Sequence, residues 1–398
     1  MTRDVSKNKD FLFVLPSFSF SPPGGYLVVF ELATFLKDND YNVSIVFIRN
    51  ILENLDQYLH DSSLVSRKRD MGLRNVLFNK YFQRKSILNL ILKFSLILKP
   101  IFSLVGLHVN YEALLYLENI DWEVHDCIPK SISVTRVIAT AWETAYFVKF
   151  FEKAAFRYYL VQHSEDDPSF SGSLSKLAAD TYNYNFKLKK IVINRATLQR
   201  FKSENPIKIS VAAHVSGQLQ IAPSLRNSEI CIQLRSGEDK GAVFGVQAAE
   251  IIHEKEPNTI IRSFGNYHGR IPPFIHHFNF LSQDDYVKQF NECSIFILPS
   301  LVEGFSTPVL EAMSCGCVPV ATACGGPEEI IFPEENGILV PIKSSQAIAD
   351  AVLNLLKDND KRIEMAYRAA DRSKDFSYER MGKSFLEGIN ANEGSIDL

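Results

Sequence analysis

A short apolar run followed by a tight turn and a helix is the feature that most constrains how this chain folds. Residues 293–300 (CSIFILPS) are mostly apolar and end in Pro and Ser, which is the pattern of a short buried strand. A helical pattern begins at residues 309–313 (VLEAM), and Gly316 ends it. Strand, turn and helix in this order form half of a parallel α/β unit, and the N-terminus of such a helix can bind an anion.

Two glutamates stand on either side of this turn. Glu303 falls in the turn itself, and Glu311 lies about two turns of helix further on. A carboxylate near the free N–H groups of the turn can orient a hydroxyl-rich ligand. A second carboxylate can hold a vicinal diol such as ribose, because a carboxylate accepts two hydrogen bonds at once.

The same alternation of strands and helices occurs twice along the chain. In the first half, the pattern predicts one helix at residues 26–37. It predicts strands at residues 11–15, 42–48, 134–139, 158–162 and 190–194. In the second half, it predicts strands at residues 229–234, 259–264 and 293–300. Two further helices are predicted at residues 242–254 and 345–357. Two successive series predict two doubly wound, Rossmann-like domains facing across a cleft, with a hinge near residues 203–223.

Length and composition limit the classes of protein that remain. A chain of 398 residues is too long for one ordinary core, and 46% hydrophobic with 22% charged residues is typical of a globular protein. A net charge of −3 argues against a general polyanion binder, so we expect no nucleic-acid partner. The first residues are polar, and no run of about eighteen apolar residues follows, which predicts a cytoplasmic protein.

Residues 293–341 resemble the donor-binding half of retaining glycosyltransferases of family GT4, which have the two-domain GT-B fold. The signature of that family is Glu-x7-Glu, which Glu303 and Glu311 match. The other matching pieces follow in order at residues 299–300, 303–305, 311–313, 316–320, 325–330 and 336–340. The resemblance implies an acceptor-side domain at 1–205, a nucleotide-sugar domain at 206–375, and a last helix crossing back to the first domain at 376–398.

The implied reaction is transfer of a hexose or deoxyhexose from a nucleoside diphosphate sugar to a glycan or lipid-linked saccharide, in cell-surface polysaccharide synthesis. The stretches 161–166 and 180–182 are similar to bacterial rhamnosyltransferases of this family, which suggests rhamnose as one candidate sugar. Two alternatives stay open: a GT-B sugar-nucleotide epimerase, and a non-catalytic scaffold that binds a sugar nucleotide.

Two cations are expected to bind the donor diphosphate. Arg235 and Lys240 follow the first strand of the second domain, and they match the Arg and Lys that the family uses for this purpose. Cations at this place stabilise the negative charge that develops on the β-phosphate as the nucleotide leaves, so the resemblance implies no metal and no other cofactor. The alternative reading is a solvated loop with two ordinary surface cations.

The resemblance assigns further positions to the donor. Gly24 and Gly25 match a loop whose backbone N–H groups approach the diphosphate, although a simple turn is the alternative. His163 matches a histidine near the donor sugar that can bond a hydroxyl or assist proton movement; the alternative is a histidine satisfied at a strand end. Glu165 and the two aspartates after it can orient the acceptor or simply be solvated.

The turn at residues 303–306 is called the donor loop below. The resemblance places Glu303 against the donor sugar and Glu311 on the ribose, and it places the N–H groups of Gly304 and Phe305 near the sugar or the phosphate. Ser306 stands where the family often has glycine, a departure that would change how closely the loop approaches the ligand. Glu329 touches the sugar in one reading and caps the next helix in the other.

Three further segments need an interpretation. Residues 61–100 carry nine basic and two acidic residues, a charge of +7, and residues 86–108 are apolar. The range 61–108 is therefore either a peripheral contact with the inner face of the cell membrane or a core helix beside a basic loop. Cys315, Cys317 and Cys324 are read as small buried residues, and the Asp-x-Asp runs at 38–40 and 358–360 as helix exits. No metal site is predicted at any of them.

Overall fold

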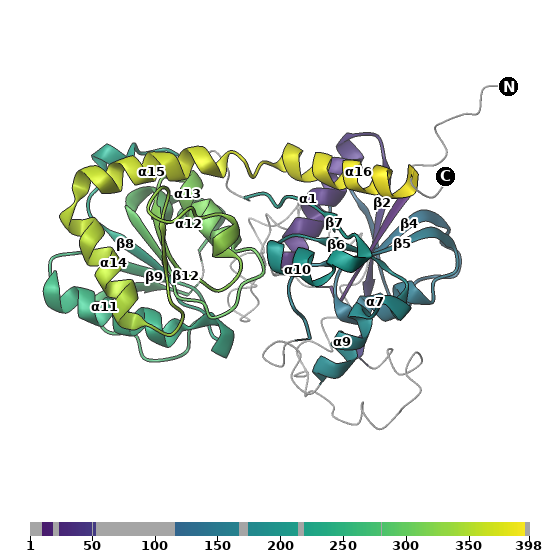
Figure 1. Cartoon of the computed structure of the whole chain (residues 1–398), viewed down its shortest axis with the longest axis horizontal. Helices are drawn as coiled ribbons and strands as arrows, with labels where there is room; N and C mark the ends of the chain where they lie inside the picture. The colour runs from purple at the N-terminus through teal and green to yellow at the C-terminus, as the bar shows by residue number, and fades with distance from the viewer. Residues whose placement is uncertain are drawn as a thin grey trace, which may run out of the picture. The chain divides into compact units, whose positions relative to one another are not determined.

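A computed structural model describes residues 10–18, 24–49, 51–52, 116–166, 174–213, 219–279 and 281–394. The contacts among them divide the chain into two compact units (Figure 1). Unit 1 holds the described residues up to Val192, residues 200–208 and those from Gly388; unit 2 holds residues 193–199 and 209–387. Residues 193–199 thus belong to unit 2, although they precede the boundary predicted from the sequence. The predicted membrane-facing range, 61–108, lies outside the described residues.

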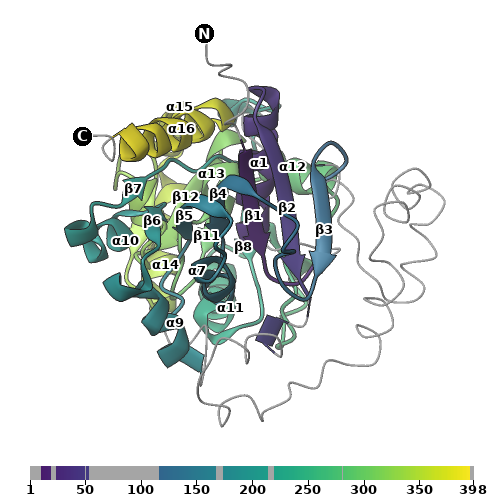
Figure 2. The ribbon, with the colours of Figure 1, turned by 90° about the vertical axis from the view of Figure 1, so that its right-hand side faces the viewer.

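Unit 1 is built on a seven-stranded sheet with the order β3-β2-β1-β4-β5-β6-β7 (Figure 2). All its neighbouring strands are parallel. The strands are β1 (Asp10–Leu15), β2 (Asn42–Ile48), β3 (Asp121–His125), β4 (Val134–Ala139), β5 (Ala154–Val161), β6 (Lys189–Val192) and β7 (Ile207–Lys208). The strand order reverses between β1 and β4, which is the topological switch point of a doubly wound sheet.

Helices connect and cover these strands. They are α1 (Gly24–Asp38), α7 (Trp142–Lys149), α9 (Ser175–Tyr182) and the end of α16 (Tyr378–Gly394). Helix α10 (Arg195–Arg200) lies almost entirely in the segment 193–199, which belongs to unit 2. The last residues of α16 are fixed to the sheet of unit 1, because the Glu393 carboxylate accepts hydrogen bonds from Arg136 Nη2 at 2.5 Å and from Tyr158 Oη at 2.8 Å. This largely buried ion pair is formed by residues more than 250 positions apart in the sequence.

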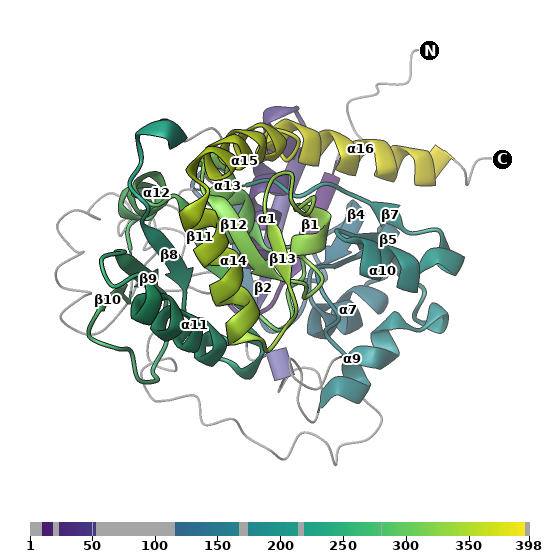
Figure 3. The ribbon, with the colours of Figure 1, turned by 60° about the vertical axis from the view of Figure 1, so that its left-hand side comes forward.

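Unit 2 repeats the same topology with its own strands, in the order β10-β9-β8-β11-β12-β13 (Figure 3). The strands are β8 (Ile230–Gln233), β9 (Ile261–Phe264), β10 (Ile275–Phe278), β11 (Ile295–Leu298), β12 (Val318–Thr322) and β13 (Ile338–Val340). Its helices are α11 (Ala242–Lys255), α12 (Gln283–Glu292), α13 (Thr307–Ser314), α14 (Ser345–Lys357) and α15 (Asn359–Ser373). The switch point of this sheet lies between β8 and β11.

The alternation of side chains along β11 separates the two sides of the unit 2 core. Ile295 and Ile297 pack with residues of α11 and α14. Phe296 points to the opposite face, where its ring meets that of Phe290 of α12 edge to face at 5.2 Å and stacks on that of Phe264 of β9 at 6.2 Å (centroid distances). Because all four residues of β11 are buried, the apolar run in the sequence is explained by a central strand that is covered on both faces.

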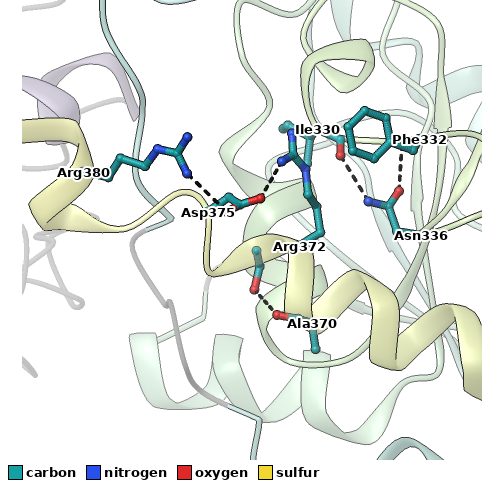
Figure 4. A network of polar contacts seen from close by, with 8 residues as sticks. Ile330, Phe332, Asn336, Ala370, Arg372, Asp375 and Arg380 are labelled. Carbon is teal, nitrogen blue, oxygen red and sulfur yellow. Dashed lines mark hydrogen bonds and ion pairs between the residues drawn. The ribbon is translucent and has the colours of Figure 1, made fainter. Parts of the chain in front are cut away.

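The turn between α15 and α16 is held by a polar network within unit 2 (Figure 4). Arg372 donates to Asp375 at 2.6 Å, and Arg380 donates to the same carboxylate at 3.2 Å. The Arg372 guanidinium also lies over the ring of Phe332, 4.6 Å from its centroid. Asn336 fixes the loop before β13 by accepting from Phe332 N–H at 2.8 Å. The network orients the start of α16 on unit 2.

The predicted fold class is confirmed, because each half of the chain forms a parallel, doubly wound sheet.

The structure also bears on the predictions for the second Asp-x-Asp run, for the cysteines and for the membrane. Asp358 stands at the exit of α14, as predicted, and it also caps the start of α15 by accepting from Lys361 N–H at 3.0 Å. Burial raises the pKa of Cys315 and of Cys324 to about 12. Within the described residues, no helix is long and apolar enough to cross a membrane.

A buried lysine makes the stability of unit 1 depend on pH. Lys190 of β6 is 1% exposed, and burial lowers its pKa to about 8, although the Glu204 carboxylate at 4.0 Å acts in the opposite direction. Between this value and the ordinary value of 10.5, the unfolded chain binds the proton and the folded chain does not. The free energy of unfolding therefore rises as the pH increases from about 8 to about 10.5.

We expect Lys190→Met to stabilise unit 1 at pH 7 by up to about 3 kcal/mol, and this gain to shrink towards pH 10.5. The measurement is urea unfolding followed by tryptophan fluorescence, because Trp122 and Trp142 are the two tryptophans of the chain and both belong to unit 1. Lys208→Met, at an exposed position of β7, is the control. An equal gain at pH 7 and pH 10.5 would contradict the assignment.

Candidate functional site

The predicted donor residues lie on the loops that follow β8 and β11, at the switch point of the unit 2 sheet. Arg235 and Lys240 lie on the loop after β8, and Glu303 lies on the loop after β11. These two strands are neighbours and parallel, so their carboxyl ends meet at the same edge of the sheet. Ligands of open α/β sheets bind outside this edge, where the crossover helices turn away to opposite faces.

Lys240 and Glu303 form an ion pair at this edge. Lys240 Nζ donates to Glu303 Oε1 at 3.1 Å, and Ser300 Oγ donates to the same oxygen at 2.7 Å. Both bonds go to Oε1, and no described residue donates to Oε2, so this oxygen can accept a hydrogen bond from a ligand hydroxyl. Asp239 Oδ2 lies 3.1 Å from the same ammonium. The site therefore holds one cation between two carboxylates.

The two loops are bound to each other through their backbones. Leu301 N–H donates to the Asp239 carbonyl at 2.7 Å. Gly241 adopts a left-handed φ of +57°, and a Cβ at this position would lie 2.1 Å from the Pro299 carbonyl oxygen. Only glycine permits this approach, so the short helical turn 238–240 that carries Lys240 has a fixed position against the Glu303 loop.

Arg235 is exposed, and its guanidinium forms no hydrogen bond or ion pair with any described residue. Its aliphatic stem lies beside Gly265, since a Cβ at that glycine would lie 3.0 Å from Arg235 Cγ. A cation at the carboxyl edge with no protein partner among the described residues is available to an anionic ligand.

Glu311 lies inside α13 and is 5% exposed. Its Oε2 accepts a hydrogen bond from Tyr286 Oη of α12 at 2.7 Å. Burial, together with the charge of Glu311, raises the pKa of Tyr286 well above its ordinary value, so the phenol stays a donor. The carboxylate has acceptor sites beyond the one that Tyr286 uses.

The loop between these glutamates has an unusual backbone. Ser306, where the family often has glycine, adopts a left-handed φ of +72° at the N-cap position of α13, and its hydroxyl makes no capping hydrogen bond. This conformation costs a non-glycine residue about 1 kcal/mol or more. Gly326 packs directly on the loop, because a Cβ there would lie 2.6 Å from the carbonyl carbon of Phe305. The ring of Phe305 is buried against Phe376, with a centroid distance of 5.8 Å.

Glu329 makes a contact that the sequence did not predict. Its Oε1 accepts a hydrogen bond from the backbone N–H of Arg195 at 2.6 Å, and Arg195 is the first residue of α10. The carboxylate thus binds the positive N-terminal end of α10, a segment of unit 2, rather than capping the helix that follows it in the sequence.

In unit 1, Gly24 and Gly25 form the first turn of α1, after β1. Gln162 Nε2 donates to the Gly25 carbonyl at 3.1 Å, and a Cβ at Gly25 would lie 2.9 Å from Gln162 Oε1. His163 follows Gln162 just after β5, so the glycines and His163 both lie at the carboxyl edge of the unit 1 sheet, where Gln162 contacts Gly25. The structure places them within unit 1 and the remaining predicted residues within unit 2.

The turn at His163 is fixed by a buried polar cluster. Tyr182 Oη donates to the His163 carbonyl at 3.0 Å and accepts from Glu165 N–H at 2.8 Å. The Glu165 carboxylate contacts Tyr159 Oη and is 7% exposed. Burial raises the pKa of Glu165 well above its ordinary value. Glu165, which was expected to meet the acceptor or solvent, is instead an internal residue.

Sequence reasoning missed the partners that hold the predicted residues. Ser300 and Asp239 flank the Lys240–Glu303 pair, Tyr286 binds Glu311, and Asn194 donates to the Gly304 carbonyl. Ser300 and Asp239 lie within the motifs already recognised, so their polar side chains were a usable signal. Tyr286 and Asn194 lie 25 and 110 positions from their partners, and no local pattern identifies them.

Part of the chain is similar in sequence to known glycosyltransferases. Residues 270–372 match the family model of glycosyl transferases group 1. A segment is 34% identical over 104 residues to D-inositol 3-phosphate glycosyltransferase of Corynebacterium urealyticum, covering 26% of this chain and 24% of that protein. Another relative is the N,N'-diacetylbacillosaminyl-diphospho-undecaprenol alpha-1,3-N-acetylgalactosaminyltransferase of Campylobacter jejuni, 30% identical over 27% of this chain and 28% of that protein. The matches span about a quarter of the length of these curated relatives.

Solved structures resemble the whole chain. HepE of Anabaena, determined in complex with UDP-glucose, aligns with a TM-score of 0.64 at 14% identity, covering 96% of this chain and 99% of that one. TarM of S. aureus, in a complex that includes UDP, aligns with a TM-score of 0.62 at 14% identity, covering 96% and 100%. The fold is GT-B. At these identities the likeness establishes the fold alone.

Proposed function

We propose that the protein is a retaining glycosyltransferase that moves a hexose or deoxyhexose from a nucleoside diphosphate sugar to a glycan or lipid-linked saccharide. The observation that carries this proposal is the Lys240–Glu303 ion pair at the switch point of unit 2, on the same loop as Arg235, whose guanidinium has no partner among the described residues. The family match of residues 270–372 and the GT-B fold support it.

Each of these groups has a chemical task in such a reaction. The bond from the anomeric carbon to the β-phosphate oxygen breaks, so negative charge accumulates on the departing diphosphate. The Lys240 ammonium and the Arg235 guanidinium stabilise that charge without a metal ion. Glu303, anchored through Oε1, presents Oε2 to a hydroxyl of the donor sugar. The departing phosphate takes the proton of the acceptor hydroxyl as the acceptor attacks from the same face.

The donor base and the acceptor follow from weaker observations. HepE and TarM were determined with UDP-glucose or UDP, so uridine is our first candidate for the base. The Campylobacter jejuni relative is named for a diphospho-undecaprenol-linked acceptor, which favours a lipid-linked saccharide and a place in cell-surface polysaccharide synthesis. Rhamnose stays a prediction, since none of the relatives named above is a rhamnosyltransferase. Contact of residues 61–108 with a membrane surface also stays a prediction.

Calorimetric titration against UDP, GDP, dTDP and their common sugar conjugates tests the proposal, first without metal and then with magnesium. We expect one nucleotide to bind without metal, which would identify the base. If no nucleotide binds, or binding requires magnesium, the roles of Arg235 and Lys240 are wrong. Release of free nucleotide that depends on an added saccharide separates a transferase from an epimerase and from a scaffold.

Glu311→Gln tests the ribose contact separately. The substitution preserves the shape of a buried side chain but removes its charge, so we expect the affinity for the nucleotide to fall about tenfold. The wild type should bind UDP more tightly than 2′-deoxy-UDP, and the variant should lose this preference. Tyr286→Phe removes only the donor to Glu311 and serves as the control. An unchanged preference in Glu311→Gln would place the ribose elsewhere.

A further inference from the structure

Asn194 connects the first turn of α10 to the donor loop of unit 2. Its Nδ2 donates to the Gly304 carbonyl at 2.7 Å. Its Oδ1 accepts from Thr197 N–H and from Thr197 Oγ1, both at 2.8 Å. The side chain is 5% exposed, and residues 193–199 belong to unit 2. One buried carboxamide therefore caps a helix and holds the peptide next to Glu303.

The orientation of this carboxamide is fixed by its partners. Thr197 N–H can only donate, and the Gly304 carbonyl can only accept, so Oδ1 and Nδ2 cannot exchange places. The position of the segment is fixed a second time by Glu329, which accepts from Arg195 N–H at 2.6 Å. Two hydrogen bonds from adjacent residues thus fasten residues 194–195 to two loops at the carboxyl edge of the sheet.

The bond to the Gly304 carbonyl also determines the direction of the next N–H group. In a planar trans peptide, the carbonyl of Gly304 and the N–H of Phe305 point in opposite directions. No described residue accepts from Phe305 N–H. Gly326 packs against the following backbone and limits rotation of this peptide. The Phe305 N–H is therefore held in one direction, away from Asn194, and is available to a ligand.

We propose that Asn194 is a positioning residue of the donor loop, which directs the Phe305 N–H towards the diphosphate-sugar half of the donor. This inference rests on the proposed function and adds to it a residue from the first half of the sequence. An N–H group beside the Lys240–Glu303 pair interacts with phosphate or sugar, not with the nucleoside. Loss of Asn194 therefore affects only that half of the ligand.

The substitution that isolates this role is Asn194→Asp. Aspartate accepts from Thr197 N–H as asparagine does, so the helix cap is kept. A carboxylate oxygen then replaces Nδ2 opposite the Gly304 carbonyl, and attraction becomes repulsion. Asn194→Ser is the second variant, because serine also caps a helix but is too short to reach Gly304. Asn183→Asp is the matched control: Asn183 accepts from Asn185 N–H at 3.0 Å in unit 1 and is exposed.

The experiment compares the affinities for UMP, UDP and UDP-glucose, or for the corresponding series of the base found by titration. We expect Asn194→Asp and Asn194→Ser to bind UMP within twofold of the wild type, and to lose about tenfold in affinity for UDP or UDP-glucose. Melting temperatures should stay within about 2 °C, and Asn183→Asp should behave as wild type.

The outcomes separate the two proposals. If the wild type binds no nucleotide of the panel, the proposed function is wrong and the role of Asn194 is wrong with it. If the wild type binds but both variants lose affinity equally for UMP, UDP and UDP-glucose, Asn194 only maintains the fold of the loop. If neither variant changes any of the three affinities, the Gly304 contact has no part in donor binding. The last two results overturn the inference and leave the proposed function standing.

Discussion

Replacing Lys240 with alanine is expected to lower turnover by about a hundredfold to a thousandfold, while the affinity for the donor changes by less than about tenfold. The reason is that charge on the β-phosphate grows as the sugar leaves, so the ammonium interacts more strongly with the transition state than with the bound donor. In the free protein, Lys240 already has Glu303 and Asp239 as partners at 3.1 Å, which limits what it contributes to initial binding.

The measurement is the initial rate of nucleotide release at saturating donor, together with the dissociation constant from calorimetry. Lys240→Arg keeps the charge and should retain part of the activity, although a guanidinium does not reproduce the geometry of an ammonium. Lys255→Ala removes the same charge from an exposed position at the far end of α11 and should act as wild type. Equal losses in affinity and in turnover would mean that Lys240 binds the ground state only.

The sequence allowed the position of the proposed donor residues in the fold to be predicted, because these residues belong to local units. Lys240 and Glu303 each lie on a loop that leaves a recognisable apolar strand, and parallel strands bring such loops to one edge. The pairing of β8 with β11 needed no knowledge of side-chain contacts. The topology alone brought the two loops together, and a resemblance to a known family supplied the roles.

The contacts that position these residues could not be predicted from the sequence. Asn194 lies 110 positions before Gly304, and Glu329 binds a backbone N–H 134 positions away. Such partners depend on the completed fold and carry no periodic signal. Five strands were missed: β3, β7, β10, β12 and β13. DWEVH, IK and IHHF are too polar or too short to be recognised as strands, while VPVAT contains a proline and ILV is only three residues long.

Arg226→Met is expected to reduce the stability of unit 2 by about 4 kcal/mol or more. The Arg226 side chain is buried and donates to carbonyl groups at the ends of two helices. Nη1 donates to the carbonyls of Phe290 and Cys293 at the end of α12, at 3.0 and 2.9 Å. Nη2 donates to the carbonyl of Cys315, the C-cap of α13. The guanidinium thus satisfies the acceptors that both helices leave unpaired.

Methionine fills a similar volume but removes the donors that Arg226 supplies. The Cys317 thiol still donates to the carbonyls of Phe290 and Cys293, whereas the carbonyls of Cys315 and Ile221 lose the guanidinium. Each such loss costs about 1 to 3 kcal/mol before relaxation. Urea unfolding followed by circular dichroism measures the effect. Arg226→Lys should recover only part of the loss, because an ammonium cannot reach both helix ends as the planar fork does. The control is Arg368→Met, which breaks an exposed ion pair with Glu364 and should cost less than about 0.5 kcal/mol. A loss below about 1 kcal/mol in Arg226→Met would mean that water replaces the guanidinium at both helix ends.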